Sequence, residues 1–239
     1  MRVLSFSETG YVRRNNEDAY LVMPEHGLYA VADGMGGHLA GEIAARTALR
    51  QLESVAGELK ELAEVDLEVW VRQALNKANR VVFESSTRQP ETEGMGTTLT
   101  VFIQLGNRAL VANVGDSRAY LWHGQQLTRV TDDHSLVGEL LRFGQISPAE
   151  AEKHPRRHVL TRAIGAAEQI EADCFELALE TGDVVFLCTD GFSNVVTEEE
   201  ISREFGRTAS WDERLAVLRQ MVFERGAPDN FTVLCCICD

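Results

Sequence analysis

The sequence is poor in positive charge. It holds 23 lysines and arginines against 37 aspartates and glutamates, which gives a formal net charge of -14 at pH 7. A surface this acidic repels phosphate backbones and anionic lipid headgroups. We therefore expect neither nucleic acid nor an anionic membrane as a partner.

Long apolar runs are also missing. No segment approaches the roughly 20 apolar residues that a membrane-spanning helix needs. The first eight residues, MRVLSFSE, lack the apolar core of a secretory signal peptide, and charged residues soon follow. These features predict a cytoplasmic protein. Its content of 44% hydrophobic and 25% charged residues is that of an ordinary globular chain.

Cysteine is scarce, and the five cysteines do not suit a disulfide framework. Their number is odd, and a cytoplasmic setting disfavours disulfide bonds. Three of them, Cys235, Cys236 and Cys238, lie on an apolar strand pattern. The sequence has no second cluster of cysteine or histidine at zinc-ligand spacing. We therefore expect buried core thiols rather than a zinc site.

The chain shows no internal repeat, low-complexity tract or linker, so we expect one domain over residues 1–239. Apolar runs bounded by turn residues predict strands, and apolar residues at helical spacing predict helices. The expected strands are 3–7, 19–23, 28–32, 97–104, 108–114, 118–122, 173–177, 183–188 and 231–237. The expected helices are 41–52, 67–85, 197–205 and 211–225, with two short helical pieces between 135 and 154.

The order of these elements indicates how they pack. Successive strands joined by short turns, such as Gly115-Asp116, favour antiparallel pairing. The strands 109–114, 184–188 and 232–237 are apolar at consecutive positions, so both of their faces are expected to be covered. The predicted fold class is α+β: a four-layer α/β/β/α sandwich of two antiparallel sheets flanked by helix pairs.

Aspartates stand at the ends of the apolar strands. Three strands run into an aspartate with a glycine beside it, at Asp33, Asp116 and Asp190, and Asp229 precedes another apolar run. Carboxylates at the ends of buried strands cost free energy unless positive charge pairs with them. Apart from Arg118, no lysine or arginine lies in these segments. Several hard oxygen donors without a counter-charge predict a bound divalent cation, Mg²⁺ or Mn²⁺.

Seven motifs in order resemble those of the metal-dependent serine/threonine protein phosphatases, the protein phosphatase 2C family. The segment from Arg13 to Asp18 is similar to the family's opening RxxNED motif, and the segment from Asp33 to Gly37 to its DGxGG motif. The other five motifs are Gly96-Thr97-Thr98, Gly115-Asp116-Ser117-Arg118, LTRAIG at 160–165, Thr189-Asp190-Gly191 and Asp229-Asn230. The resemblance spans nearly the whole chain, and the DGMGGH form resembles the bacterial single-domain members.

The resemblance implies hydrolysis of phosphoserine and phosphothreonine in proteins, in opposition to a serine/threonine kinase. Two divalent ions, Mn²⁺ or Mg²⁺, would share one water molecule and lower its pKa. The sequence has no cysteine or histidine nucleophile loop, which favours direct attack by this water over a phosphoenzyme. Phosphorylated proteins and a kinase are the partners implied, and we expect a monomer.

The resemblance also assigns each carboxylate a role. Asp33 would bridge both ions, and the backbone carbonyl of Gly34 would serve one of them. Asp190 and Asp229 would hold the other ion. A weaker third ion would lie on Asp116, shared with Asp190. The acidic residues of the opening motif would hold metal-bound waters; they are Glu17 and Asp18.

Arg13 is the natural phosphate-binding residue, because its planar guanidinium matches two phosphate oxygens. Its position alone leaves a second role open. In a chain this acidic, an arginine beside Glu17 and Asp18 is also suited to a structural salt bridge. The motif match favours phosphate binding.

One position departs from the family pattern. Many eukaryotic members have a histidine in the middle of the DGxGG motif, where it is thought to act as general acid, but this chain has Met35. His38 lies three residues on and is the nearest candidate proton donor. Two alternatives stay open: His38 is a surface residue that caps the following helix, or a metal-bound water supplies the proton.

The polar segment from about 132 to 158 corresponds to the flap that lies beside the active site in this family. Its basic residues would meet phosphorylated or acidic substrates, or would form a solvated rim. The residues concerned are Arg142, Arg156 and Arg157.

Two other functions are compatible with the fold. A pseudophosphatase scaffold would use it for binding alone, but such a protein is expected to have lost metal ligands that this sequence keeps. A phosphatase of the sigma-factor pathway generally lacks the motif from Arg13 to Asp18, which is intact here.

The variant His38→Ala tests whether His38 or a metal-bound water supplies the proton. A general acid contributes roughly 10²–10⁴-fold to the rate when the leaving group is an alkoxide. As general acid, His38 is expected to matter for phosphoserine and phosphothreonine peptides and far less for p-nitrophenyl phosphate, in steady-state assays of both. Equal loss on both substrates indicates a distorted site, and no loss on either leaves His38 at the surface and the proton to a metal-bound water.

Overall fold

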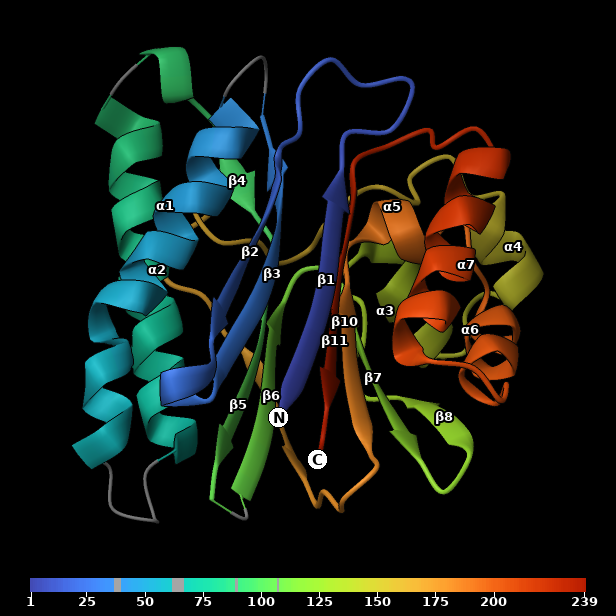
Figure 1. The fold of residues 1–239 in the computed structure, drawn as a ribbon. Helices are drawn as coiled ribbons and strands as arrows, with labels where there is room; N and C mark the ends of the chain where they lie inside the picture. Colours follow the sequence, from blue (N-terminus) through green and yellow to red (C-terminus); the bar gives the residue numbers. More distant parts are fainter. Residues whose placement is uncertain (37–39, 62–66, 89, 107) are drawn as a thin grey trace.

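Two antiparallel sheets lie face to face between two layers of helices (Figure 1). The computed structural model describes residues 1–36, 40–61, 67–88, 90–106 and 108–239. Among these residues, no helix is both long and apolar enough to cross a membrane. The predicted α+β sandwich is confirmed.

The first sheet has five strands in the order β1-β11-β10-β7-β8. It joins the two ends of the chain, because β1 pairs with β11 over its whole length. Its strands are β1 (Arg2–Glu8), β7 (Arg118–His123), β8 (Gln126–Arg129), β10 (Val184–Cys188) and β11 (Phe231–Ile237).

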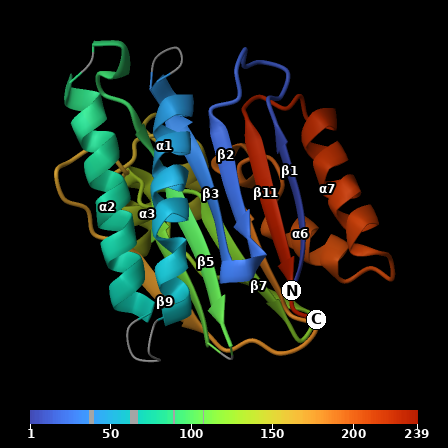
Figure 2. The same cartoon turned by 60° about the vertical axis from the view of Figure 1, so that its left-hand side comes forward.

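The second sheet has the order β2-β3-β5-β6-β9, and the short strand β4 pairs with β3. Figure 2 shows β2, the edge strand of this sheet, beside β11 and β1 of the first sheet. Its strands are β2 (Asp18–Met23), β3 (Leu28–Met35), β4 (Gly96–Thr97), β5 (Leu99–Leu105), β6 (Arg108–Val114) and β9 (Asp173–Leu177).

The central strands carry apolar residues on both faces because each face meets a different core. In β3, Tyr29 and Val31 pack between the two sheets, whereas Leu28 and Ala30 face the helices. Side chains alternate between the faces of a strand, so a strand covered on both sides has no polar face. The cysteines of β11 follow this rule and are free, buried thiols, as predicted.

Helix pairs cover the outer faces of both sheets (Figure 1). The helices α1 (Ala40–Val55) and α2 (Leu67–Arg88) pack on the second sheet, and α6 (Glu198–Phe205) and α7 (Trp211–Glu224) on the first. Thr197 and Ser210 begin α6 and α7 with capping boxes, which satisfy backbone N–H groups of the first turn. The remaining helical turns are η1 (Pro24–His26), η2 (Ala56–Glu61) and η3 (Pro90–Thr92).

Besides the unpredicted turns η1 to η3, three elements differ from the sequence prediction. The strand expected over 97–104 is interrupted at Thr98, whose N–H donates to the carbonyl of Asp33. The strand β8 and the four-residue helix α5 (Asp190–Ser193) were not predicted. Both are too short to show a period in the sequence. The two short helices expected between 135 and 154 are present as α3 (Leu136–Arg142) and α4 (Pro148–Glu152).

Candidate metal-dependent active site

Strand register brings the predicted aspartates to one edge of the sandwich. Asp18 at the start of β2 lies opposite Asp33 near the end of β3. In the other sheet, Cys188 at the end of β10 pairs with Val233 and Arg118. The residues just beyond these pairs therefore meet at the same edge. A cleft of about 910 Å³ is lined by Asp33, Gly34, Asp116, Asp190 and Asp229, together with Arg13 and Glu17.

Two threonines hold the backbone of Asp33. The N–H of Asp33 donates to Oγ1 of Thr98 at 2.9 Å, and its carbonyl accepts from the N–H of Thr98 at 2.9 Å and from Oγ1 of Thr97 at 2.8 Å. Thr97 also pairs with Ile164 in both directions. Thr97, Thr98 and Ile164 are buried, so the carboxylate of Asp33 projects from a fixed point.

Glycines allow the backbone to close around the carboxylates. A Cβ atom at Gly34 would lie 2.1 Å from the carbonyl oxygen of Gly41, and one at Gly191 would lie 1.9 Å from that of Asn230. No side chain fits at these distances, so any substitution would force segments of the site apart. The glycines beside Asp33 and Asp190 therefore serve close packing of the backbone at the cleft.

Asp18 is a buried carboxylate with an unpaired oxygen. Its Oδ2 accepts a hydrogen bond from Thr189 at 2.8 Å, whereas Oδ1 is buried and has no partner. Burial is the main reason that the pKa of Asp18 is raised to about 7, against the lowering effect of Thr189. A buried carboxylate oxygen without a donor costs free energy, and a water molecule on a cation would satisfy it.

Burial also raises the pKa of three other aspartates of the site. Burial, followed by the charges of Asp18 and Asp190, raises the pKa of Asp33 well above its usual range. Burial and Asp190 raise the pKa of Asp116 to about 8. The pKa of Asp190 is also raised, chiefly by burial. Like charges gathered in a poorly solvated cleft resist ionisation together, and a divalent cation would remove that resistance.

These residues fit a hydrated Mg²⁺ or Mn²⁺. Within the described segments, no three His, Cys, Asp or Glu residues are arranged tightly enough to hold an ion by themselves. Hard cations of this size commonly keep several waters and take only one or two carboxylates. The cleft is suited to a hydrated ion of this kind rather than to an ion ligated by protein atoms alone. It offers desolvated carboxylates, a buried oxygen without a partner and closely packed backbone.

Arg13 lies at the mouth of this cleft and contacts Asp229. Its Nη2 donates to Oδ2 of Asp229 at 2.8 Å, and its side chain is 55% exposed. This pair, followed by smaller effects of Glu17 and Asp33, raises the pKa of Arg13. The salt bridge that the sequence left open is therefore formed, with Asp229 rather than with Glu17 or Asp18. Only one nitrogen of the guanidinium is used, so its other donors face the cleft or solvent.

The loop that carries Arg13 and Glu17 is fastened by Asn230. Its Oδ1 accepts from the N–H of Glu17 at 2.9 Å, and its Nδ2 donates to the carbonyls of Thr9 and Asn15. The carboxylate of Glu17 packs close to Gly41 at the start of α1, and burial raises its pKa. Asn230 thus holds the loop against the start of β11.

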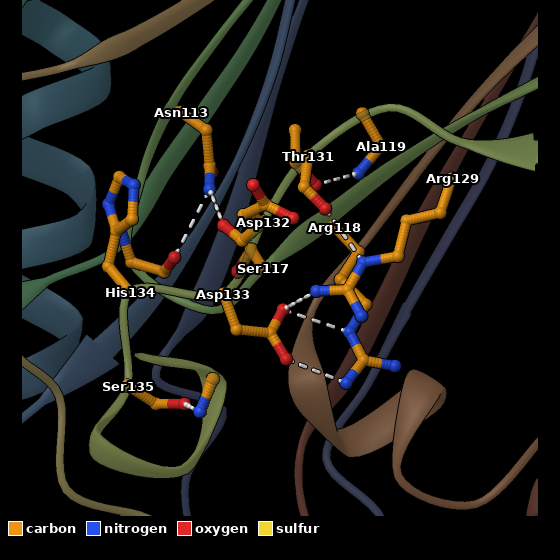
Figure 3. A network of polar contacts seen from close by, with 12 residues as sticks. Asn113, Ser117, Arg118, Ala119, Arg129, Thr131, Asp132, Asp133, His134 and Ser135 are labelled. Carbon is orange, nitrogen blue, oxygen red and sulfur yellow. Dashed lines mark hydrogen bonds and ion pairs between the residues drawn. The ribbon is translucent and has the colours of Figure 1, made fainter. Parts of the chain in front are cut away.

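The predicted flap begins beside Asp116. Figure 3 shows the side chains of Asp133 and His134 pointing to opposite sides of the chain. Asp133 pairs with Arg118 at 2.8 Å and also with Arg129. Arg118 is the cation nearest to Asp116 in sequence, and its bidentate pair with Asp133 occupies it away from the carboxylate cluster.

The far end of the flap reaches the cleft. Arg157 and His158 line it, and both are exposed. Arg142 instead stacks on the ring of Phe143, with the guanidinium 5.3 Å from the ring centre. The flap therefore contributes one of its three arginines to the cleft lining, and a histidine that the sequence did not single out for the site.

The structure assembles all the predicted carboxylates, Gly34 and Arg13 at one edge. His38 lies outside the described residues. Sequence reasoning gave no role to Thr98, Asn230 or His134, which hold the backbone of the site. Thr98 and Asn230 do belong to quoted motifs, and that membership was the only signal for them.

Similarity in sequence to known proteins indicates one family. The family model described as protein phosphatase 2C matches residues 11–222. The serine/threonine phosphatase stp of Listeria monocytogenes is 36% identical over 232 residues, which cover 95% of this chain and 92% of that protein.

Solved structures agree as well. The serine/threonine phosphatase Stp1 of Staphylococcus aureus has a TM-score of 0.92 and 30% identity, over 99% of this chain and 94% of that one. The catalytic domain of serine threonine protein phosphatase PstP, in complex with two manganese ions, has a TM-score of 0.86 and 33% identity, over 100% of this chain and 98% of that one. With the matched motifs and the carboxylate cleft, these likenesses establish that the chain belongs to the protein phosphatase 2C family.

Proposed function

We propose that this protein hydrolyses phosphoserine and phosphothreonine side chains in other proteins, with two divalent cations bound to the carboxylate cluster. The observation that carries this proposal is the cleft itself. It holds Asp33, Asp116 and Asp190, whose pKa values burial raises, together with Asp229, which pairs with the exposed side chain of Arg13. A phosphorylated side chain is an anion that needs both a cationic centre and a donor of hydrogen bonds.

The residues divide the work. Asp33 and the carbonyl of Gly34 would hold one ion, with Asp33 bridging to a second held by Asp190 and Asp229. Bound in this way, the ions would supply a water of lowered pKa and neutralise phosphoryl charge. Glu17 and Asp18 would orient waters, which gives the unpaired Oδ1 of Asp18 its partner.

Arg13 would bind and orient the phosphoryl group. Its contact with Asp229 anchors one edge of the guanidinium and leaves the other donors free to meet phosphate oxygens. The flap residues Arg157 and His158 would line the path of the substrate chain. A proton for the leaving alkoxide would come from His38 or from a water.

Phosphorylated proteins and a serine/threonine kinase that acts on them are the partners we propose. We also propose the third, weaker ion on Asp116 and Asp190 that the family resemblance implies; both residues line the cleft, and burial raises the pKa of each. We further propose a cytoplasmic monomer that takes part in signal transduction and uses Mn²⁺ or Mg²⁺. The intact carboxylate cluster and Arg13 disfavour a pseudophosphatase scaffold, and the intact opening motif disfavours a role in the sigma-factor pathway.

Removing one carboxylate tests this function directly. Hydrolysis of a phosphothreonine peptide should require Mn²⁺ or Mg²⁺ and stop with a chelator. Asp190→Ala and Asp229→Ala should each abolish it, because each loses a ligand of an ion that generates the nucleophile. Asp212→Ala, which removes an exposed carboxylate outside the cleft, should behave as wild type. Near-normal turnover of either cluster variant at micromolar Mn²⁺ would refute the two-ion assignment.

Without metal, stability should fall as the pH rises through neutrality. Asp18 and Asp116 hold protons to about pH 7 and about pH 8 in the folded chain, but only to about pH 4 when unfolded. The folded state therefore binds more protons in this window, and raising the pH favours unfolding.

Melting temperatures between about pH 5 and about pH 8 check this, because only between the unfolded pKa near 4 and the folded pKa values does the folded chain hold protons that the unfolded chain has lost. Added Mn²⁺ should restore stability, by roughly 2.7 kcal/mol at 100 times its dissociation constant. Asp116→Asn should reduce the fall of the melting temperature with pH in the metal-free protein. A melting temperature that stays level or rises with pH in chelator, or that ignores millimolar Mn²⁺, would contradict the carboxylate cluster.

Arg13→Ala should chiefly impair substrate capture. A hydrogen bond to a charged group contributes about 1.5–3 kcal/mol, so the Michaelis constant should rise by roughly tenfold or more. Metal affinity, measured by calorimetry, should change little. Arg14→Ala is the matched control, because Arg14 is an exposed neighbour that does not line the cleft. Wild-type kinetics in Arg13→Ala would leave Arg13 as the ion-pair partner of Asp229 alone.

A further inference from the structure

The two ends of the flap meet at one residue, His134. Its carbonyl accepts from the N–H of Thr161 at 2.8 Å, on the chain that leaves the flap. Next to it, Ser135 and Leu160 form a β-bridge, and Leu136 donates to Val159. The segment between them therefore leaves and returns through a single closed neck.

His134 is also bonded twice to Gly115, the residue before Asp116. The N–H of His134 donates to the carbonyl of Gly115 at 3.0 Å, and the N–H of Gly115 donates to Nδ1 of His134 at 3.2 Å. Because Nδ1 accepts, Nε2 carries the proton and donates to Asp173 at 3.2 Å. Asp173 in turn accepts from Arg162, which lies just beyond the neck. The imidazole is thus fixed on both sides.

The turn that His134 holds is tightly fitted. Gly115 has φ +113°, and a Cβ atom there would lie 2.5 Å from Cγ2 of Thr98. The hydroxyl of Thr98 bonds to Ser117 at 2.7 Å and to the N–H of Asp33. The side-chain N–H of Asn113 also donates to the carbonyl of Gly115, at 3.1 Å. A shift of the flap neck would therefore pull on the turn that carries Asp116.

We propose that His134 is a positioning residue that joins the flap and the Asp116 turn into one unit. Closing the flap and binding a cation at Asp116 then stabilise each other, because both require the paired arrangement of His134 and Gly115. This inference rests on the proposed function only for the identity of the cation. This positioning role explains why the imidazole of His134, which is 3% exposed, is buried in the neck of the flap.

Proteolysis of the flap measures this coupling without an activity assay. Trypsin can cut after four exposed basic residues of the flap, at Arg142, Lys153, Arg156 and Arg157. At a Mn²⁺ concentration of ten times the weak-site dissociation constant, linkage predicts about tenfold slower cleavage there in the wild-type protein. Peptide mapping by mass spectrometry assigns each cut.

Two variants of His134 separate positioning from packing. His134→Leu fills the site but removes the acceptor for Gly115, so protection by Mn²⁺ should fall below about twofold. His134→Asn places an oxygen near the position of Nδ1 and should recover most of the protection, although it cannot reach Asp173. Asp116→Ala should lose protection as well. His123→Leu, at a 51% exposed histidine at the end of β7, should match wild type.

The outcomes are decisive in each direction. Protection in wild type and His134→Asn but not in His134→Leu, with all variants folded by circular dichroism, supports the coupling. Equal protection in His134→Leu and wild type, or no protection in wild type, overturns it. If His134→Leu does not fold, loss of protection in His134→Asn overturns the proposal and retained protection supports it. Failure to hydrolyse phosphopeptides would refute the proposed function and leave these readouts unaffected.

Discussion

Repulsion among buried carboxylates is the constraint on which this site depends. The fold gathers Asp18, Asp33, Asp116 and Asp190 where burial and mutual charge raise the pKa of each one. Nearby arginines offset this repulsion only in part. The charge of Arg118 lowers the pKa of Asp116 and Asp190, but its hydrogen bonds go to Asp133, and the hydrogen bond of Arg13 goes to Asp229. Such a cluster is costly without a cation and favourable with one. The rest of the site holds these carboxylates in place.

Residues outside the cluster hold it in place, through hydrogen bonds from their side chains to the backbone of the site. Thr97 and Thr98 fix Asp33, Asn230 fixes the loop of Glu17, and His134 fixes the turn of Asp116. These residues come from three separate parts of the chain, at 97–98, 134 and 230. The two sheets, with their strand ends at one edge, make those distant contacts possible. The carboxylate cluster therefore destabilises the centre of the site, and the surrounding hydrogen bonds stabilise it.

Sequence alone was sufficient for the sandwich and for most of the site. Apolar runs at successive positions marked the doubly covered strands, and their terminal aspartates marked the cluster. The break at Thr98 and the short helix that begins at Asp190 could not be predicted, because tertiary hydrogen bonds and not local period decide them. Arg13 could not be placed either, since spacing does not show that Asp229, more than two hundred residues away, is its partner. The role of His134 likewise depends on a contact between separate turns.

The proposed function depends on a cation site at the carboxylates of the cleft. An anomalous difference map at the manganese edge, from crystals grown with Mn²⁺, tests it most directly. We expect two strong peaks within contact of Asp33, one of them shared with Asp190 and Asp229. A map without peaks at these carboxylates, from protein shown to be folded at the same Mn²⁺ concentration, would contradict the account.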